Sequence, residues 1–357
     1  MTDRIIPGLR RGTVTAPRSK SQEQRLLLAD FLAGKTDGLV FAAEDADDIL
    51  AMKRCLAALA SPEIEPVLDC GESGAARRFL APVAAALGKR PRWRMAGRLG
   101  VRPFLDYPTL AAGTFDLPGD ISSQFVTGLL FALPLIDGDS EIRFTSPLQS
   151  RGYVELTLKV LRDAGIVIES AADGFKVRGA QRYSAPTTAV EGDWSGAAFW
   201  LAMNALGSAV RVEGLDAGSL QPDRAVVGLL KDWPAAIDVS AHPDLFPALA
   251  VVAAARPETT RFTGIGRLRL KESDRVAAMA DVLTRFGADV SERSDEFTVH
   301  GVCGRFRGGD FTAFGDHRIA MAIAVGATVA DDVITIDDTG CVAKSYPGFF
   351  KDFHRCA

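Results

Sequence analysis

Hydrophobic and polar residues along this chain alternate between two patterns, one typical of strands and one typical of helices. Compact apolar runs predict strands at residues 12–15, 39–41 and 259–265. Apolar residues spaced three and four apart predict helices at residues 22–32, 46–59, 125–133, 154–161, 197–206, 245–255, 276–286 and 319–329. The alternation of the two element types indicates an α/β (α+β) fold.

An internal repeat supports this interpretation. One copy contains a helix ended by Gly165 and a β-hairpin closed by Gly179, and the other places Gly287 and Gly301 in the same roles. In both copies the second glycine lies fourteen residues after the first. We infer duplicated α/β units. Comparable hairpins are missing from two segments, which predict truncated units: residues 102–119 and 229–244.

Composition sets the class and the compartment. The chain has 357 residues, 47% of them hydrophobic, which predicts at least two domains with real cores. The net charge of −4 does not favour nucleic acid, so any anion site must be a local cluster of bases. The N-terminus has no apolar signal core, and the apolar run 125–136 is too short to span a membrane.

Cysteine usage adds the redox environment. The five cysteines are Cys55, Cys70, Cys303, Cys341 and Cys356. They include no C-x-x-C pair, so neither a zinc site nor a disulfide framework is indicated. We expect a reducing cytosol.

The segment 267–275 carries the strongest chemical signal. It lies between a predicted strand and a predicted helix and holds Arg267, Arg269, Lys271 and Arg275. Cations at a helix N-terminus oppose the helix dipole, so we expect something anionic to offset that cost. For this turn alone, a solvated charged turn is the favoured interpretation, and the case for a site depends on similar turns elsewhere.

Similar turns precede other predicted helices. Ser21 is a plausible N-cap with Gln24 three residues on, which leaves Lys20 just ahead of the helix. Asp244 opens an apolar helix, where an N-cap is the structural alternative to a functional role. Because helix starts at one locus aim their positive ends together, these turns predict a positive cleft for two anionic substrates, at least one phosphorylated.

Ten motifs occur in order along nearly the whole chain: Ser19-Lys20-Ser21 with Arg25, Gly74 with Arg78, Arg102-Pro103, Ser122-Ser123-Gln124-Phe125, Ser150 with Tyr153, Val190-Glu191-Gly192-Asp193, Pro243-Asp244, Lys271-Glu272-Ser273-Asp274-Arg275, Asp316-His317-Arg318, and Ala343-Lys344 with Pro347. Together they resemble the 5-enolpyruvylshikimate-3-phosphate synthase family of enolpyruvyl transferases. Glu72 and Ala75 stand where that family usually has Asn and Thr, and Arg267 where some members have Asn. The choice between Arg77 and Arg78 as the ligand arginine stays open.

The resemblance implies a two-domain inside-out barrel of repeated βαβαββ units, with the active site in a cleft between the domains. Domain one would comprise residues 1–14 and 191–357, and domain two residues 15–190. The implied reaction transfers the enolpyruvyl group from phosphoenolpyruvate to the 5-hydroxyl of shikimate 3-phosphate and releases phosphate. No metal or organic cofactor is implied, and we expect a monomer.

The resemblance also implies roles for individual residues. The candidates for proton transfer are Lys20, Asp244 and Glu272. The candidates for holding phosphoenolpyruvate are Lys20, Arg102, Arg275, Arg318 and Lys344. The candidates for holding shikimate 3-phosphate are Ser21, Arg25, Ser122, Ser123, Gln124, Ser150, Tyr153 and Lys271. Gly74 and Arg78 complete the predicted binding site, whereas His317 is expected to support Arg318 in a packed turn.

Two rival functions remain. The sister enzyme that acts on a UDP-amino sugar shares the fold and relies on a loop cysteine, but no cysteine lies near Arg102 in this sequence. A non-catalytic phosphometabolite-binding relative would lack an acid or base, and this chain keeps the three candidates for proton transfer.

Overall fold

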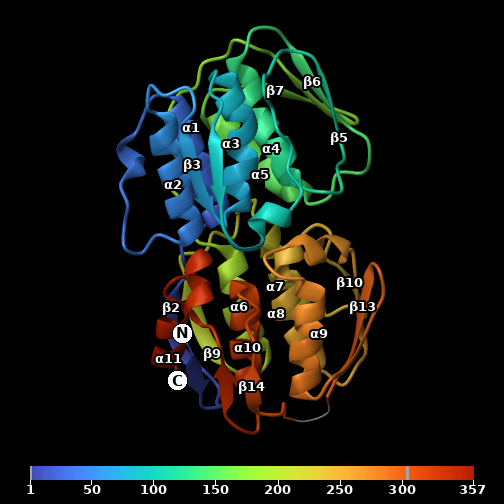
Figure 1. Ribbon diagram of the computed structural model, residues 1–357. Coiled ribbons are helices and arrows are strands. Elements are labelled where there is room, and N and C mark those ends of the chain that lie inside the picture. Colours follow the sequence, from blue (N-terminus) through green and yellow to red (C-terminus); the bar gives the residue numbers. More distant parts are fainter. Residues whose placement is uncertain (1, 303–304) are drawn as a thin grey trace. The chain divides into compact units, whose positions relative to one another are not determined.

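The computed structural model describes residues 2–302 and 305–357, so Cys303 lies outside the described residues. The chain divides into two compact units. The split unit runs to Arg18 and resumes at Glu191, and the continuous unit comprises Ser19–Val190. Each unit has its own hydrophobic core of helices packed beside sheets (Figure 1). The mixture of helices and strands confirms the predicted α/β class.

The continuous unit contains α1 (Lys20–Leu32), η1 (Asp37–Leu39), α2 (Asp47–Leu59), β3 (Val67–Gly71), α3 (Gly74–Ala86), β4 (Arg92–Met95), η2 (Gly97–Val101), β5 (Thr114–Leu117), α4 (Ser123–Ala132), η3 (Leu133–Leu135), β6 (Ser140–Phe144), α5 (Arg151–Asp163), β7 (Ile168–Ala171) and β8 (Gly174–Val177). Strands β3 and β4 pair in parallel, and the other strands form a sheet of order β5-β6-β8-β7.

The split unit begins with β1 (Asp3–Ile5) and β2 (Arg11–Thr15) and resumes with α6 (Trp194–Ala205), β9 (Ala209–Glu213), η4 (Pro222–Ala225), α7 (Val226–Lys231), β10 (Ala236–Asp238), η5 (Pro243–Leu245), α8 (Phe246–Ala254), β11 (Thr260–Thr263), η6 (Gly266–Leu270), α9 (Arg275–Phe286), β12 (Asp289–Glu292), β13 (Glu296–His300), β14 (Gly309–Phe311), α10 (His317–Ala327), β15 (Ile334–Ile336), η7 (Gly340–Lys344) and α11 (Phe349–Arg355). Its sheets have the orders β1-β15-β14, β10-β11-β13-β12 and β2-β9.

The repeat predicted from glycine spacing is confirmed. In one copy β5 pairs with β6 in parallel and the β7-β8 hairpin pairs antiparallel with β6 through β8. In the other copy β10, β11, β13 and β12 pair in the same order and with the same directions. Gly287 ends α9 with a φ of 98°, and Gly165 follows α5 with a φ of 79°, a left-handed geometry that glycine adopts without strain.

The truncated units are also present as predicted. In the described segment after β4, η2 and a stretch without strands lead directly to β5. In the described segment after α7, the next element is β10. Neither segment carries a hairpin equivalent to β7-β8, so β4 has no strand pairing with its outer edge among the described residues. No described helix combines the length and apolar character that a membrane span requires.

Two local predictions are wrong. Residues 39–41 form no strand; η1 ends at Leu39, and Val40 and Phe41 are 73% and 54% exposed. Three residues cannot form a core-facing strand without a partner. The N-cap of α1 is Ser19 rather than Ser21. The extended segment ends at Arg18, which bridges to Gly192, so the helix begins immediately afterwards and Lys20 is its first residue.

Candidate active site

In the continuous unit, hydrogen bonds tie the start of α1 to the starts of α3 and α5. Gln24 donates from Nε2 to the hydroxyl of Ser73, the N-cap of α3, over 3.3 Å. Arg25 donates from Nη2 to the Tyr153 carbonyl in the first turn of α5, over 3.1 Å. These helix starts therefore lie together, and their dipoles contribute positive potential at the same place.

Arg78 ties α3 to α4. Its Nη1 donates to Gln124 Oε1 over 2.7 Å, and its Nε and Nη2 donate to the Pro103 carbonyl. Gly74 and Arg102 lie beside it, because a Cβ built on Gly74 would lie 2.9 Å from Arg78 Nη1 and 3.2 Å from Arg102 Cζ. The structure thus brings these predicted residues into one cluster.

Arg77 points elsewhere. It pairs with Asp106, and its guanidinium lies 4.0 Å from the ring centroid of Trp93. Of the two arginines that the sequence left open, Arg78 is therefore the one beside the other predicted residues.

Lys20, the first residue of α1, forms a 2.9 Å ion pair with Asp48 on α2. Asp48 was missed because an acid in the first turn of a helix is ordinary. The predicted serines and Tyr153 all lie at helix starts: Ser21 within the first turn of α1, Ser122 as the N-cap of α4, Ser123 as its first residue, Ser150 as the N-cap of α5, and Tyr153 in the first turn of α5. Ser150 has a left-handed φ of 53°, which is uncommon for a residue with a side chain.

Arg25 of α1 is hydrogen-bonded to α5. Its Nε donates to Thr157 Oγ1 over 2.8 Å, and Thr157 shares a 2.9 Å hydrogen bond with Thr127. Burial lowers the pKa of Arg25 to about 10, so it stays charged at neutral pH. The two threonines were missed, since threonine inside a helix gives no sequence signal of a site.

In the split unit, Arg275 is the centre of an ion-pair network. Its side chain is 1% exposed, and it donates to Asp316 over 2.8 Å, to Asp244 over 2.7 Å and to Glu272 over 2.8 Å. Asp316 is the N-cap of α10, and Arg275 is the first residue of α9. The anionic partner that the basic turn required is thus provided partly by the protein's own carboxylates.

Asp244 does not act as an N-cap, because the N-cap position of α8 belongs to Leu245. Its carboxylate instead lies 3.0 Å from Arg318 Nη2 and 3.6 Å from Lys271 Nζ, in addition to its contact with Arg275. Burial favours the neutral acid, but the charges of Arg318, Lys271 and Arg275 outweigh it and hold the pKa of Asp244 well below its usual value. Asp244 is therefore ionised at neutral pH.

For Lys271, the effect of burial on the pKa outweighs that of the neighbouring carboxylates. Burial lowers its pKa to about 8, with Arg275 acting in the same direction and Asp244 opposing it. An ammonium group with this pKa can exchange a proton near neutral pH. Glu272 lies next to it in the chain and pairs with Arg275, with 13% of its side chain exposed.

The other predicted residues of the split unit lie nearby or pack against the same helix. Arg318 is the second residue of α10 and is 4% exposed. Lys344 is buried in η7, an element that packs against α10. His317 is 1% exposed at the start of α10. Arg267 donates to the Ser240 carbonyl over 2.6 Å and is one of the charges that act on Lys271.

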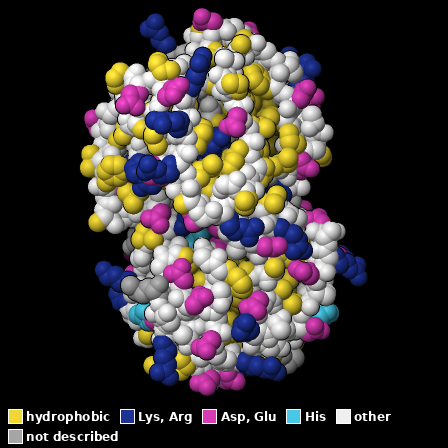
Figure 2. Space-filling view, viewed as in Figure 1, with side chains coloured by type: hydrophobic (Ala, Val, Ile, Leu, Met, Phe, Trp, Pro, Cys, Tyr) yellow, Lys and Arg dark blue, Asp and Glu magenta, His cyan; other side chains and the backbone are white. Residues whose placement is uncertain are grey.

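Charge elsewhere is mixed. On the face seen in Figure 2, Lys and Arg side chains are interspersed with Asp and Glu. Among the described residues, no group of three or more His, Cys, Asp or Glu could hold a metal ion. Two α/β units whose helix starts gather guanidinium and ammonium groups define a class of protein that binds small phosphorylated or carboxylated molecules.

The comparisons with known proteins give the family. The family model described as EPSP synthase (3-phosphoshikimate 1-carboxyvinyltransferase) matches residues 96–237 and 225–353. A 3-phosphoshikimate 1-carboxyvinyltransferase of Clostridium kluyveri is 39% identical, with 81% of this chain and 78% of that protein covered. One of Methanocorpusculum labreanum is 35% identical, with 96% of both chains covered. The chain belongs to the EPSP synthase family.

Solved structures agree on the fold. An EPSP synthase from Acinetobacter baumannii superposes with a TM-score of 0.76 at 22% identity, covering 100% of this chain and 98% of that one. An enolpyruvyl transferase from Streptomyces tendae superposes with a TM-score of 0.67 at 16% identity, covering 99% and 96%. The predicted enolpyruvyl transferase fold is confirmed.

Proposed function

We propose that the chain transfers the 1-carboxyvinyl group from phosphoenolpyruvate to the 5-hydroxyl of shikimate 3-phosphate and releases phosphate, a step of the shikimate pathway. One observation carries this proposal beyond family membership. Asp244, an ionised carboxylate, lies among Arg318, Lys271 and Arg275, so a base and the cations that bind anions occupy one site. A non-catalytic anion-binding protein has no need of that carboxylate.

The chemistry proceeds by addition and then elimination. The 5-hydroxyl oxygen attacks C2 of phosphoenolpyruvate as Asp244 accepts the hydroxyl proton, and C3 gains a proton. The resulting tetrahedral ketal then loses a proton from C3 as its C–O bond to phosphate breaks. Lys20 and Glu272 are the candidates for proton transfer at C3 and at the departing phosphate.

A bound anionic substrate would change the pKa of Asp244. Cations that hold its pKa low are also the groups that bind anions, and an anionic substrate competes with Asp244 for Arg318 and Lys271. When part of their charge is neutralised by substrate, the pKa of Asp244 rises toward its usual value. Substrate binding thereby makes this carboxylate a stronger base when the base is needed.

The remaining groups bind and position. We assign shikimate 3-phosphate to Ser21, Arg25, Ser122, Ser123, Gln124, Ser150, Tyr153 and Lys271. We assign phosphoenolpyruvate to Lys20, Arg102, Arg275, Arg318 and Lys344, with Gly74 and Arg78 shaping the space beside Arg102. The reaction requires both clusters to act on the same pair of substrates. The proposed setting is the cytosol, and the proposed state is a monomer, which sedimentation equilibrium measures.

The direct test is phosphate release by the purified chain with both substrates present. We expect phosphate release to require shikimate 3-phosphate. UDP-N-acetylglucosamine in its place should give no product in the same assay. Phosphate release with the UDP-sugar instead would assign the sister activity. Calorimetric binding of shikimate 3-phosphate without any turnover would assign a binding protein.

Lys271 should set an alkaline limit on activity. As pH rises through about 8, Lys271 loses its proton and no longer holds an anion, so kcat/KM for shikimate 3-phosphate should fall. Lys271→Arg keeps its charge at any accessible pH, so its profile should stay flat across this range. Superimposable pH profiles for the two proteins would remove Lys271 from this role.

The same titration affects folding with a defined sign. The folded pKa of Lys271 lies below its usual value of 10.5, so the unfolded chain binds more protons between about pH 8 and pH 10.5. Burial of the charged ammonium therefore lowers the free energy of unfolding by its full amount below about pH 8. This destabilisation decreases as the pH rises toward 10.5.

Space beside Gly74 should control affinity for phosphoenolpyruvate. The Cβ of Gly74→Ala would displace the guanidinium of Arg78 or Arg102, and we expect KM for phosphoenolpyruvate to rise about tenfold, or about 1.4 kcal/mol of binding. Gly100→Ala is the matched control, because a Cβ there meets no atom within 4 Å. Steady-state kinetics on both variants decide the point, and an unchanged KM in Gly74→Ala would show that neither arginine sets this affinity.

A further inference from the structure

The truncated unit of the continuous unit contains a cavity of about 610 Å³, separate in its lining residues from the predicted active-site residues. In the complete units, the strand equivalent to β4 pairs with a hairpin, and a second helix packs on the helix equivalent to α3. After β4 both are missing from the described chain, and residues 106–109 line the cavity together with residues of α3 and β4 instead. The cavity thus lies where one unit was shortened.

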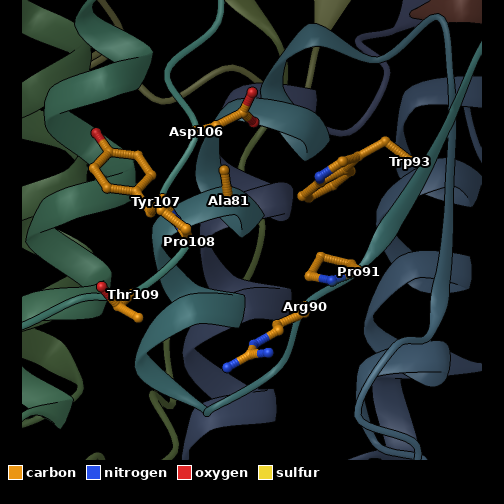
Figure 3. A pocket seen from close by; sticks show the side chains of 8 residues that line it. All are labelled: Ala81, Arg90, Pro91, Trp93, Asp106, Tyr107, Pro108 and Thr109. Carbon is orange, nitrogen blue, oxygen red and sulfur yellow. The ribbon is translucent and has the colours of Figure 1, made fainter.

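The cavity has flat, largely apolar walls. Figure 3 shows Trp93 and Pro91 on one side and Tyr107 and Pro108 on the other, with Ala81 of α3 between them. Its volume is in the range of small-molecule sites. Aromatic rings and prolines on two sides of one cavity suit a planar apolar group.

Charge is distributed unequally around the cavity. Asp106 lines one end but is paired with Arg77, which also stacks on Trp93. Arg90 lines the opposite end (Figure 3), and no carboxylate in the described part of the chain pairs with its guanidinium. Burial raises the pKa of Tyr107 to about 12, so its hydroxyl stays protonated and able to donate a hydrogen bond. A ligand anion would therefore be attracted to the Arg90 end, because the charge of Asp106 at the other end is offset by Arg77.

We propose that this cavity binds a small aromatic carboxylate, with its ring between Trp93 and Tyr107 and its carboxylate on Arg90. Arginine offers bidentate geometry to a carboxylate, and aromatic rings stack with favourable energy. A second copy of the chain is a weaker occupant, since the lining is concave and comes from short segments of α3, the start of β4 and residues 106–109.

The test is calorimetry on the full chain with 3-phenylpropionate, compared with its uncharged analogue 3-phenyl-1-propanol. We expect saturable binding of the carboxylate and an affinity about tenfold lower in Arg90→Gln, as for loss of one charge-assisted hydrogen bond. The alcohol should bind weakly and equally to both proteins. Arg92→Gln is the matched control, because it removes the same charge from neighbouring β4 at a residue that does not line the cavity.

A second variant guards against unfolding. Trp93→Leu is not used, because it removes a ring on which Arg77 stacks and a loss of binding would not be separable from misfolding. Thr109→Trp fills the cavity from an exposed position and should abolish binding while leaving the thermal midpoint unchanged. Equal affinity for acid and alcohol, equal effects of Arg90→Gln and Arg92→Gln, displacement by phosphoenolpyruvate, or a concentration-dependent dimer broken by Thr109→Trp would each overturn the proposal.

Discussion

Replacing Asp244 by asparagine should lower kcat by about 10²- to 10⁴-fold, the range for loss of a general base. Asparagine keeps the size and a hydrogen-bonding oxygen for Arg318 and Arg275, but it cannot accept the proton of the 5-hydroxyl. Removing a negative charge from a cluster of cations should leave binding of anionic substrates intact or tighter. The expected signature is therefore a loss in kcat without a rise in KM, measured by phosphate release, together with shikimate 3-phosphate binding measured by calorimetry.

Asp274→Asn provides the control. Asp274 belongs to the same basic turn, but its carboxylate caps α9 by accepting from the backbone of Val276 and Ala277. Asparagine caps a helix as well as aspartate, so this variant should keep kcat within about twofold. If Asp244→Asn turns over at the rate of Asp274→Asn, Asp244 is not the base.

Arg275→Met should destabilise the split unit by about 3–5 kcal/mol, the cost of removing one partner from a buried ionic network. The side chain is 1% exposed, and its loss leaves Asp316, which is 0% exposed, without its main cation. Methionine fills similar volume, so the effect reports charge rather than a cavity. Urea unfolding at pH 7 measures it.

Arg285→Met is the matched control on the same helix. Arg285 pairs with Asp281 on the surface with 50% of its side chain exposed, and such pairs contribute about 1 kcal/mol or less. The pH dependence is a second test. The folded pKa of Asp244 is held low, so its ion pairs stabilise the fold above its unfolded pKa, and this contribution disappears as pH falls through the folded pKa. The difference in free energy of unfolding between wild type and Arg275→Met should therefore become smaller in acid. A destabilisation at pH 7 no larger than that of Arg285→Met would contradict the assigned network.

Sequence reasoning succeeded where a pattern was long or repeated. Glycines at equal spacing predicted both hairpins. The first glycine of each copy, Gly165 or Gly287, has the left-handed geometry that favours glycine. At the second, Gly179 or Gly301, a Cβ would collide with a backbone carbonyl oxygen. Sequence reasoning failed where the outcome depended on a distant partner. The start of α1 is fixed by the bridge of Arg18 to Gly192. Residues 39–41 have the composition of a strand but would need a neighbouring strand to form one.

The site shows the same division. The charged turns were visible in the sequence, but which charge meets which carboxylate was not. Asp244 is a credible N-cap from its position alone, and only the fold reveals that it faces Arg318 and Arg275. Arg77 and Arg78 are adjacent and identical in type, and only the fold shows that Arg78 meets Gln124 whereas Arg77 meets Asp106.

The division of the chain into split and continuous units also has a consequence for synthesis on the ribosome. The continuous unit is complete once residue 190 has emerged, whereas β2 must wait for β9, which ends at residue 213, and β1 for β15, which ends at residue 336. Since domains fold as units during synthesis, the inserted unit should reach its native state first. Strand β2 can pair once residues 209–213 have been made, but β1 remains unpaired, and exposed to chaperones and proteases, until residues 334–336 have been made.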